Sequence, residues 1–411
     1  MHIKSTNWSG IWICFSAGLA AAITMNKASP AALNIAADLN LSLFQIGWLV
    51  SVVAIGMIVL GFASGHLILR FGALKVLTAG VAVLLLTPWL SVFATTSPLL
   101  MVERSLEGIG VILVMVSAPA AIINVSRPED VGLSMAVWAL WMPTGSSLIF
   151  LLAPWLLNID GWRSLWLSSA VAAAVVFPFL LYLLRVDRRE IQAVPLSESA
   201  TVSTSTQSIN SGSISVPGAV LLAIIFLCFG AGFFGVLTYL PTYLHTVSGF
   251  STANASLLTA LLPAVLIVGN LLAGGLLHRG LQPALVMSIS AVLVSITLWV
   301  TMILADGLLA IIFLVLFGLF TGVVPTAMFA QAPRFAASPR AVGVVIGIMV
   351  TGQGIGLLFA PPLIAYLVGP SQNWIAALPL LVMLPLIVSL LAVYLPRFEN
   401  QWHAAGSAAE Q

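Results

Sequence analysis

Charged side chains are scarce in this sequence, which has 14 Lys and Arg and 12 Asp and Glu among 411 residues, or 6% of the chain. About a quarter of the residues of an average soluble domain are charged, because a soluble surface has to be hydrated. A chain that is 61% hydrophobic and so poor in charge cannot cover such a surface. We therefore expect a membrane protein that crosses the bilayer several times.

Cysteine is also scarce, and metal-binding and nucleotide-binding patterns are missing. Cys14 and Cys228 both lie in apolar runs, so neither a disulfide framework nor a zinc site is indicated. The sequence has no His-Glu-x-x-His pattern and no Gly-x4-Gly-Lys-Ser/Thr loop, which argues against a metalloenzyme and an ATP-driven pump. The charge rings or repeated carbonyl filters of a channel do not occur either. We expect no cofactor and no bound metal, and no nucleic-acid partner.

The chain divides into twelve apolar segments, each bounded by charges, Pro or Gly. They cover residues 10–36, 44–69, 73–95, 98–124, 131–157, 163–185, 216–244, 252–277, 282–304, 307–331, 340–368 and 373–396. A stretch rich in Ser and Thr, 186–215, has low hydrophobicity and no periodicity, which is typical of a solvated linker. This pattern predicts an all-α membrane protein with twelve transmembrane helices, in two six-helix halves (1–185 and 216–397) around a central cavity, with a cytoplasmic tail at 398–411.

A weak repeat supports the division into halves. An offset of 209 residues relates Ser42 to Ser251, Gly65 to Gly274, Arg70 to Arg279 and Gly145 to Gly354. Gly and Ser are common in this chain, so each match alone is weak, but all four fall at the corresponding point of each half. Parallel six-helix repeats place a substrate site at their interface near the middle of the bilayer.

The distribution of Lys and Arg predicts the orientation. With the N-terminus in the cytoplasm, 11 of the 14 basic residues lie on the cytoplasmic side, Lys27 and Arg104 lie within membrane segments, and Arg163 alone lies outside. This bias is what the positive-inside rule requires. We therefore expect a multi-pass protein of the plasma (inner) membrane with both termini in the cytoplasm. The first apolar run resembles a signal peptide but continues past any cleavage point, so it is interpreted as an uncleaved first span.

Two motifs resemble those of the major facilitator superfamily of secondary transporters. The stretch from Gly65 to Lys75, GHLILRFGALK, is similar to the family's signature between spans two and three, although Leu69 stands where the family usually has Asp. Arg104 with Gly108 and Gly110 is similar to its fourth-span motif. The resemblance covers the whole chain and implies that spans one and four line the central cavity, and that a monomer is the usual form.

The resemblance also implies a cytoplasmic latch. In the family, the basic residues of this signature bind helix carbonyls or acids of a neighbouring span, so Gly65, Arg70, Gly72 and Lys75 are its candidates here. A tight turn with positive-inside residues explains the same stretch equally well. Lys27 with Pro30, Ala118-Pro119-Ala120 and 141–145 (WMPTG) look more like the cyanate-permease-like branch.

Lys27 is the most informative single residue. It lies with Asn26 inside the first apolar run, where a lysine costs roughly 2.5–3.5 kcal/mol on insertion scales. Lys27 comes nine positions before the outer end of span one and Glu107 nine positions after the outer start of span four, so both lie roughly 13 Å below the outer boundary. An ion pair between them is therefore geometrically available. We expect Lys27 to face a water-filled cavity, because ~13 Å is farther than a lysine can comfortably snorkel.

Three charged residues share one face of span four. Arg104 can pair with Glu107 at a spacing of three, and Glu103 lies on the same face. These residues are either a self-neutralised structural cluster or a proton relay in which Glu107 accepts the proton. With Lys27 the set carries two positive and two negative charges, and protonating Glu107 would leave it net positive, which favours co-transport of a small anion with protons.

The second half has few charges, so its candidates are neutral polar residues. Tyr239, Asn270 and Gln353 can offer hydrogen bonds to a ligand, and Trp141 in span five can wall a pocket for a planar or apolar molecule. The sequence thus predicts a secondary active transporter that works by alternating access, with proton-coupled import of a small organic or inorganic anion. A proton-driven exporter of drug-like compounds is the alternative, and a membrane-embedded enzyme is remote.

Overall fold

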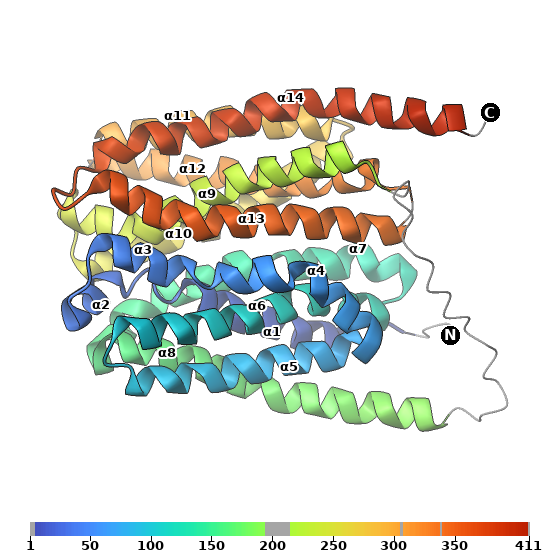
Figure 1. Ribbon diagram of the computed structural model, residues 1–411, viewed down its shortest axis with the longest axis horizontal. Helices are drawn as coiled ribbons and strands as arrows, with labels where there is room; N and C mark the ends of the chain where they lie inside the picture. Colours follow the sequence, from blue (N-terminus) through green and yellow to red (C-terminus); the bar gives the residue numbers. More distant parts are fainter. Residues whose placement is uncertain (1–4, 194–213, 305–306, 338, 410–411) are drawn as a thin grey trace.

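The computed structural model describes residues 5–193, 214–304, 307–337 and 339–409, which form a bundle of long helices (Figure 1). Apart from one isolated bridge between Ile214 and Ala336, these residues contain no β-structure. The helices are α1 (Trp8–Asn26), α2 (Ala32–Leu39), α3 (Leu43–Ser51), α4 (Ala54–Phe71), α5 (Ala73–Leu86), α6 (Ser97–Val125), α7 (Val131–Ala139), α8 (Trp141–Ala193), α9 (Val216–Thr246), α10 (Thr252–His278), α11 (Pro283–Leu304), α12 (Gly307–Phe329), α13 (Pro339–Val368) and α14 (Leu378–Ala409).

The twelve predicted segments are recovered in this bundle. Eleven helical stretches of the described residues are long and apolar enough to cross a membrane, and one of them, Pro128–Val186, has 59 residues. Helix α8 within it bends at Asp160 and Gly161, where Gly161 has a left-handed φ of 55°, so it supplies two spans. In Figure 1 the first six spans (α1 to α8) form the lower half and the last six (α9 to α14) the upper half.

Corresponding helices of the two halves begin in the same way. Ser42 is the N-cap of α3 and accepts a hydrogen bond from the Gln45 N–H, while the Gln45 side chain returns to the Ser42 N–H, which completes a capping box. Ser251 is the N-cap of α10 and accepts from the Asn254 N–H. The two serines related by the offset of 209 therefore have the same role.

The first span differs from the prediction of one helix over 10–36. Helix α1 ends at Asn26, residues 27–31 form a turn, and α2 is a separate short helix. Pro30 explains the interruption, because its ring has no N–H for an intrahelical hydrogen bond and clashes with the preceding turn. We call residues 27–31 the break.

The predicted ends of the two halves also need correction. Helix α8 continues to Ala193, past the expected start of the linker at 186, and α14 continues to Ala409, through most of the stretch predicted as a tail. Hydropathy marks where a helix leaves the apolar layer, and a helix can extend beyond that point into water. The rest of the linker, 194–213, lies outside the described residues.

Glycines allow the helix backbones to approach closely. A Cβ atom added at Gly352 or Gly356 of α13 would lie 2.2 or 2.3 Å from a carbonyl oxygen of α9, and one at Gly108 of α6 would lie 2.2 Å from the Val53 carbonyl oxygen. Small residues at such crossings are the usual device of membrane helix packing. Gly352 and Gly356 therefore let α13 pack closely against α9.

We expect Gly352→Ala to destabilise the protein by about 1–3 kcal/mol, because the added methyl group overlaps the Ala223 carbonyl. The matched control is Gly132→Ala in α7, where a Cβ meets nothing within 4 Å and the helix gains about 0.5–1 kcal/mol. Thermal unfolding of the purified variants measures both. Equal melting temperatures for the two variants would contradict the packing assignment.

Candidate functional site

Four charged side chains meet in the interior of the first half. Lys27 comes from the break, and Glu103, Arg104 and Glu107 come from α6, and each has a relative exposure of 0%. We call these four residues the charge cluster. The expectation that Lys27 faces a water-filled cavity is not met in this structure, because α6 and the second part of α8 close over its ammonium group.

Lys27 finds partners on two helices. Its Nζ donates to Glu107 Oε1 in a very short contact and to Ser169 Oγ of α8 at 2.9 Å. It also lies 4.6 Å from the centre of the Trp166 ring, within the range of a cation–π interaction. The Lys27–Glu107 ion pair that matching depths in spans one and four made available is therefore formed.

Arg104 binds both Glu107 and the end of α1. Its Nη1 donates to Glu107 Oε2 at 2.6 Å and to the Thr24 carbonyl at 2.7 Å, and its Nη2 donates to the Met25 carbonyl at 3.1 Å. The last carbonyls of a helix have no intrahelical partner and carry partial negative charge. Arg104 therefore stabilises the end that Pro30 imposes on α1, inside the apolar layer where water cannot do so.

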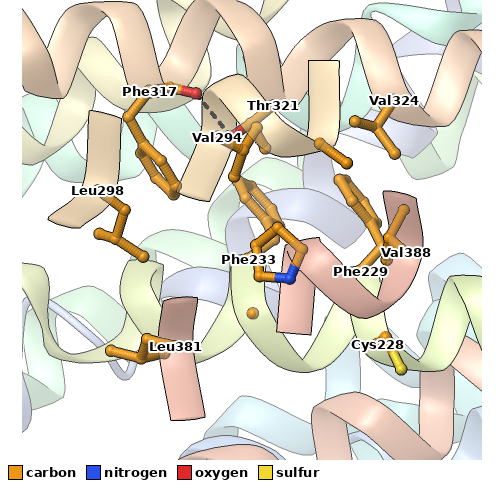
Figure 2. A pocket seen from close by; sticks show the side chains of 13 residues that line it. Cys228, Phe229, Phe233, Val294, Leu298, Phe317, Thr321, Val324, Leu381 and Val388 are labelled. Carbon is orange, nitrogen blue, oxygen red and sulfur yellow. Dashed lines mark hydrogen bonds between the residues drawn. The ribbon is translucent and has the colours of Figure 1, made fainter. Parts of the chain in front are cut away.

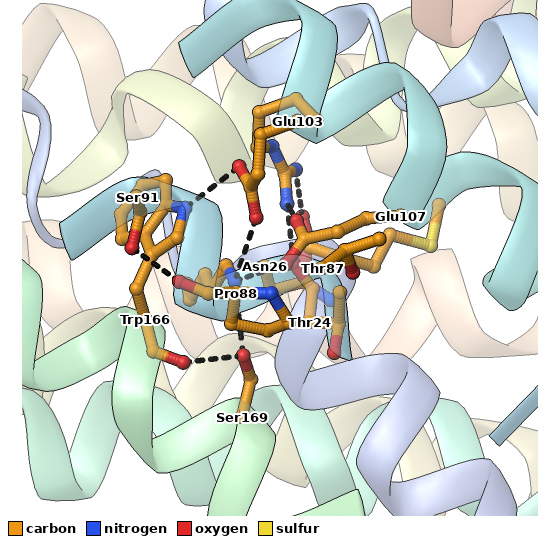
Figure 3. A network of polar contacts seen from close by, with 12 residues as sticks. Thr24, Asn26, Thr87, Pro88, Ser91, Glu103, Glu107, Trp166 and Ser169 are labelled. Carbon is orange, nitrogen blue, oxygen red and sulfur yellow. Dashed lines mark hydrogen bonds and ion pairs between the residues drawn. The ribbon is translucent and has the colours of Figure 1, made fainter. Parts of the chain in front are cut away.

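The two carboxylates of the charge cluster have unequal surroundings (Figure 3). Both oxygens of Glu107 are paired with a cation. Glu103 Oε2 accepts from the Trp166 indole N–H at 3.0 Å, while Glu103 Oε1 has no hydrogen-bond partner and lies 4.0 Å from Lys27 Nζ. A buried carboxylate oxygen without a donor is costly, so Glu103 is the less stabilised anion of the two.

Two predicted residues of the first half, Asn26 and Trp141, do not belong to the charge cluster. Asn26 Nδ2 donates to the Ala22 carbonyl and to Ser146 Oγ of α8, both at 2.9 Å. Trp141 stacks on Trp138 with ring centres 5.3 Å apart, and the Trp138 ring and the Trp141 Cβ lie close to Gly18 of α1. These contacts join α1 to the first part of α8.

The predicted residues of the second half are spread over three places. The Tyr239 hydroxyl of α9 donates to the Pro361 carbonyl of α13 at 3.0 Å and lies 3.3 Å from the Leu43 carbonyl of α3, so it reaches across the two halves. Asn270 accepts from Thr326 of α12 at 3.2 Å. Gln353 is half-buried on α13, where it packs against Gly230. The structure does not bring these residues to the charge cluster.

The latch candidates lie where α4 meets α5. Gly72 has a φ of 87° and forms the turn between the helices, and Arg70 and Lys75 are exposed on either side of it. The Arg70 guanidinium lies 5.3 Å from the Phe71 ring. Within the described ranges, neither cation is paired with a carboxylate, and Gly65 lies within α4. The latch stays a prediction.

An apolar pocket lies inside the second half (Figure 2). It lies between α9, α11, α12 and α14 and has about 20 Å³ of space for a water-sized sphere, and its lining includes Phe229, Phe233, Phe317 and Leu381. Thr321 is the only hydroxyl in the lining, and it is bound to the Phe317 carbonyl of its own helix at 2.6 Å. The pocket carries no charge. No group of three or more His, Cys, Asp or Glu that could hold a metal occurs in the part of the chain that the structure describes.

Reasoning from the sequence missed three residues of this site. Trp166 and Ser169 in α8 contact Lys27, and Ser29 in the break bonds to α9. Trp166 and Ser169 are three positions apart on one helix face, but nothing in an apolar run marks that face as the one turned toward Lys27. Ser29 stands directly before Pro30, and this Ser-Pro pair inside a span was the available signal.

Comparisons with known proteins agree with this architecture. Residues 13–349 match the sequence profile of the Major Facilitator Superfamily. A crystal structure of the D-xylose-proton symporter has a TM-score of 0.72 and 17% identity, covering 94% of this chain and 97% of that one. The E. coli xylose transporter XylE in an inward-open conformation has a TM-score of 0.74 and 17% identity, covering 94% and 95%. No curated protein sequence matches.

We expect Lys27→Met to destabilise the protein by about 3–5 kcal/mol, because it leaves a buried carboxylate without its cation. The double variant Lys27→Met/Glu103→Gln removes one charge of each sign and should regain part of that loss. Thermal unfolding of the purified variants compares the two. If the double variant is as unstable as the single one, charge balance does not govern the stability of the cluster.

Proposed function

The chain belongs to the Major Facilitator Superfamily, a family of transporters rather than enzymes, and from this premise we propose that it imports a small anion together with protons. Transport by such a protein is secondary and proceeds by alternating access. The observation that carries the proton-coupled part is the fully buried charge cluster, in which one carboxylate oxygen, Glu103 Oε1, has no partner.

The coupling proton is assigned to Glu103. Both oxygens of Glu107 are held by cations, so protonating Glu107 would break two ion pairs. Protonating Glu103 at Oε1 breaks no hydrogen bond of the described residues and removes a desolvated charge. This differs from the expectation that Glu107 accepts the proton. The D-xylose-proton symporter has the same fold, so this fold is compatible with proton coupling.

The charge count favours an anion as the solute. Lys27 and Arg104 carry two positive charges, and Glu103 and Glu107 carry two negative charges, so the cluster is neutral in total. Protonated at Glu103, it has one excess positive charge in a medium where charges are weakly screened. An anion that enters the adjoining interface between the halves is attracted by that charge. The cyanate-permease-like branch would suit this class, but the comparisons give it no support.

The same proposal includes an orientation and a state of assembly. The bias of basic residues supports the plasma (inner) membrane with both termini in the cytoplasm. The basic turn with Arg70 and Lys75 then faces the cytoplasm, where the latch would act. We propose a monomer as the transporting unit.

The test begins with a ligand screen by thermal shift, because a ligand that binds the folded state raises its stability whichever way it is transported. The panel contains small carboxylates, inorganic anions and lipophilic cations. Hits are then assayed in proteoliposomes with an imposed inward proton gradient. We expect an anion to be taken up with protons, and Glu103→Gln to lower gradient-driven uptake at least tenfold while exchange of the solute continues.

Glu129→Gln is the matched control, since Glu129 is exposed and its ion pair among the described residues is with Arg127 beside it; this variant should behave as wild type. Gradient-driven uptake by Glu103→Gln at the wild-type rate would overturn the assignment of the proton. Efflux of lipophilic cations that persists in Lys27→Met would favour the exporter instead.

A further inference from the structure

The break at residues 27–31 joins the charge cluster to the contact between the two halves. Lys27 at its start belongs to the cluster, and two residues later Ser29 bonds to α9 of the second half. We propose that Ser29 is a positioning residue that transmits the protonation state of the cluster to the opening and closing of the halves. This inference rests on the proposed function and adds how the proton is coupled to movement.

Ser29 is held against an unusual part of α9. Its Oγ lies 2.8 Å from the Leu237 carbonyl oxygen and 2.6 Å from the Thr238 carbonyl oxygen, and the residue is 3% exposed. Within a helix the Leu237 carbonyl would accept from the N–H of residue 241, but residue 241 is proline and has none. Pro241 therefore leaves a carbonyl in the apolar layer that needs a donor, and Ser29 supplies one.

The surrounding contacts show that this region closes one end of the interface. Tyr239, which follows Thr238 in the sequence, donates to the Leu43 carbonyl. Every residue of α9 from Gly230 to Leu244 is buried. A second pair of bonds joins α8 to α10, from Ser147 to the Ala260 carbonyl at 3.2 Å and from Ser256 to the Phe150 carbonyl at 2.8 Å. We call these cross-half hydrogen bonds the seam. Both α3 and α10 begin at this end of the bundle, on the left in Figure 1.

The proposed sequence of events follows from charge and connectivity. The charged groups that face Glu103 are Lys27 from the break and Arg104 and Glu107 from its own helix, while α8 contributes the neutral Trp166 and Ser169. When Glu103 takes up a proton, the attraction between its carboxylate and Lys27, 4.0 Å away, is lost. The break is then held less firmly, Ser29 leaves the carbonyls of α9, and the seam opens. Of the seam hydroxyls from the first half, only Ser29 is covalently close to the cluster.

The experiment measures opening of the seam at one of its own positions, Ser256 on α10, which lies outside both the break and the charge cluster. Ser256→Cys is introduced into a background of Cys14→Ala and Cys228→Ala, and the rate of its modification by a polar maleimide is followed in nanodiscs. Position 256 is 2% exposed, so reaction requires opening. We expect Glu103→Gln, which mimics the protonated carboxyl, to raise the rate at least threefold at pH 7.5. Because the thiolate is the nucleophile, rates at lower pH are divided by the rate of a small free thiol at the same pH, and this ratio should rise when Glu103 is intact.

Three further variants separate coupling from simple weakening of the seam. Ser29→Ala removes the link, and Pro241→Ala supplies an N–H to the Leu237 carbonyl from within α9, so in both the response to Glu103→Gln should vanish. Ser147→Ala removes a seam bond that lies outside the break, and it should keep the threefold response. Ser29→Ala and Pro241→Ala should abolish the response for different reasons, so the test can still be made if one of the two variants does not fold.

The outcomes distinguish this inference from the proposed function. An undiminished response to Glu103→Gln in Ser29→Ala and Pro241→Ala overturns the role of Ser29. If Glu103→Gln abolishes proton-coupled uptake yet leaves the modification rate unchanged in every background, the inference fails and the proposed function stands. If Glu103→Gln alters neither uptake nor modification, the proton assignment itself fails.

Discussion

The pairing of Lys27 and Arg104 with Glu107 is the interaction on which the first half depends. Three ions in an apolar interior are tolerated only when each is compensated, and here each cation also serves a second group, Ser169 for Lys27 and the end of α1 for Arg104. The pairing therefore holds together α1, α6 and α8. It also stabilises the interruption at Pro30, because the carbonyls left without an intrahelical partner at the end of α1 bind a cation instead of water.

The two halves share an order of helices, but their corresponding helices enclose different groups. The charge cluster lies among the first, fourth and sixth spans, while the apolar pocket lies among α9, α12 and α14, the seventh, tenth and twelfth spans, together with α11. Charged and hydroxyl groups in the first half thus correspond to Phe and Leu side chains in the second. Among the described residues, buried charge is consequently confined to the first half, and the second half contacts the break through backbone carbonyls such as that of Leu237.

Several features could be predicted because they depend on one helix at a time. Apolar runs identify the spans, and a constant helical rise places Lys27 and Glu107 at matching depth, so their pairing could be anticipated. Whether Lys27 contacts water or protein depends on how α8 packs over it. A uniformly apolar helix has no periodicity that indicates which of its faces is turned toward Lys27. Trp166 was missed for this reason. Tyr239, Asn270 and Gln353 were grouped only because each is polar within a span, and packing separates them.

The sequence by itself determined the membrane class, the number and order of the helices and the chemical identity of the buried charges, because hydropathy and charge act locally along the chain. Only the tertiary structure decided which carboxylate is left with an unpartnered oxygen and which hydroxyls bridge the halves. Those outcomes depend on distances between helices far apart in sequence. The physical reason is that a buried ion or carbonyl depends on hydrogen-bond partners within about 3 Å and on nearby charges and aromatic rings, and contacts of that range are set by the packing of the whole bundle.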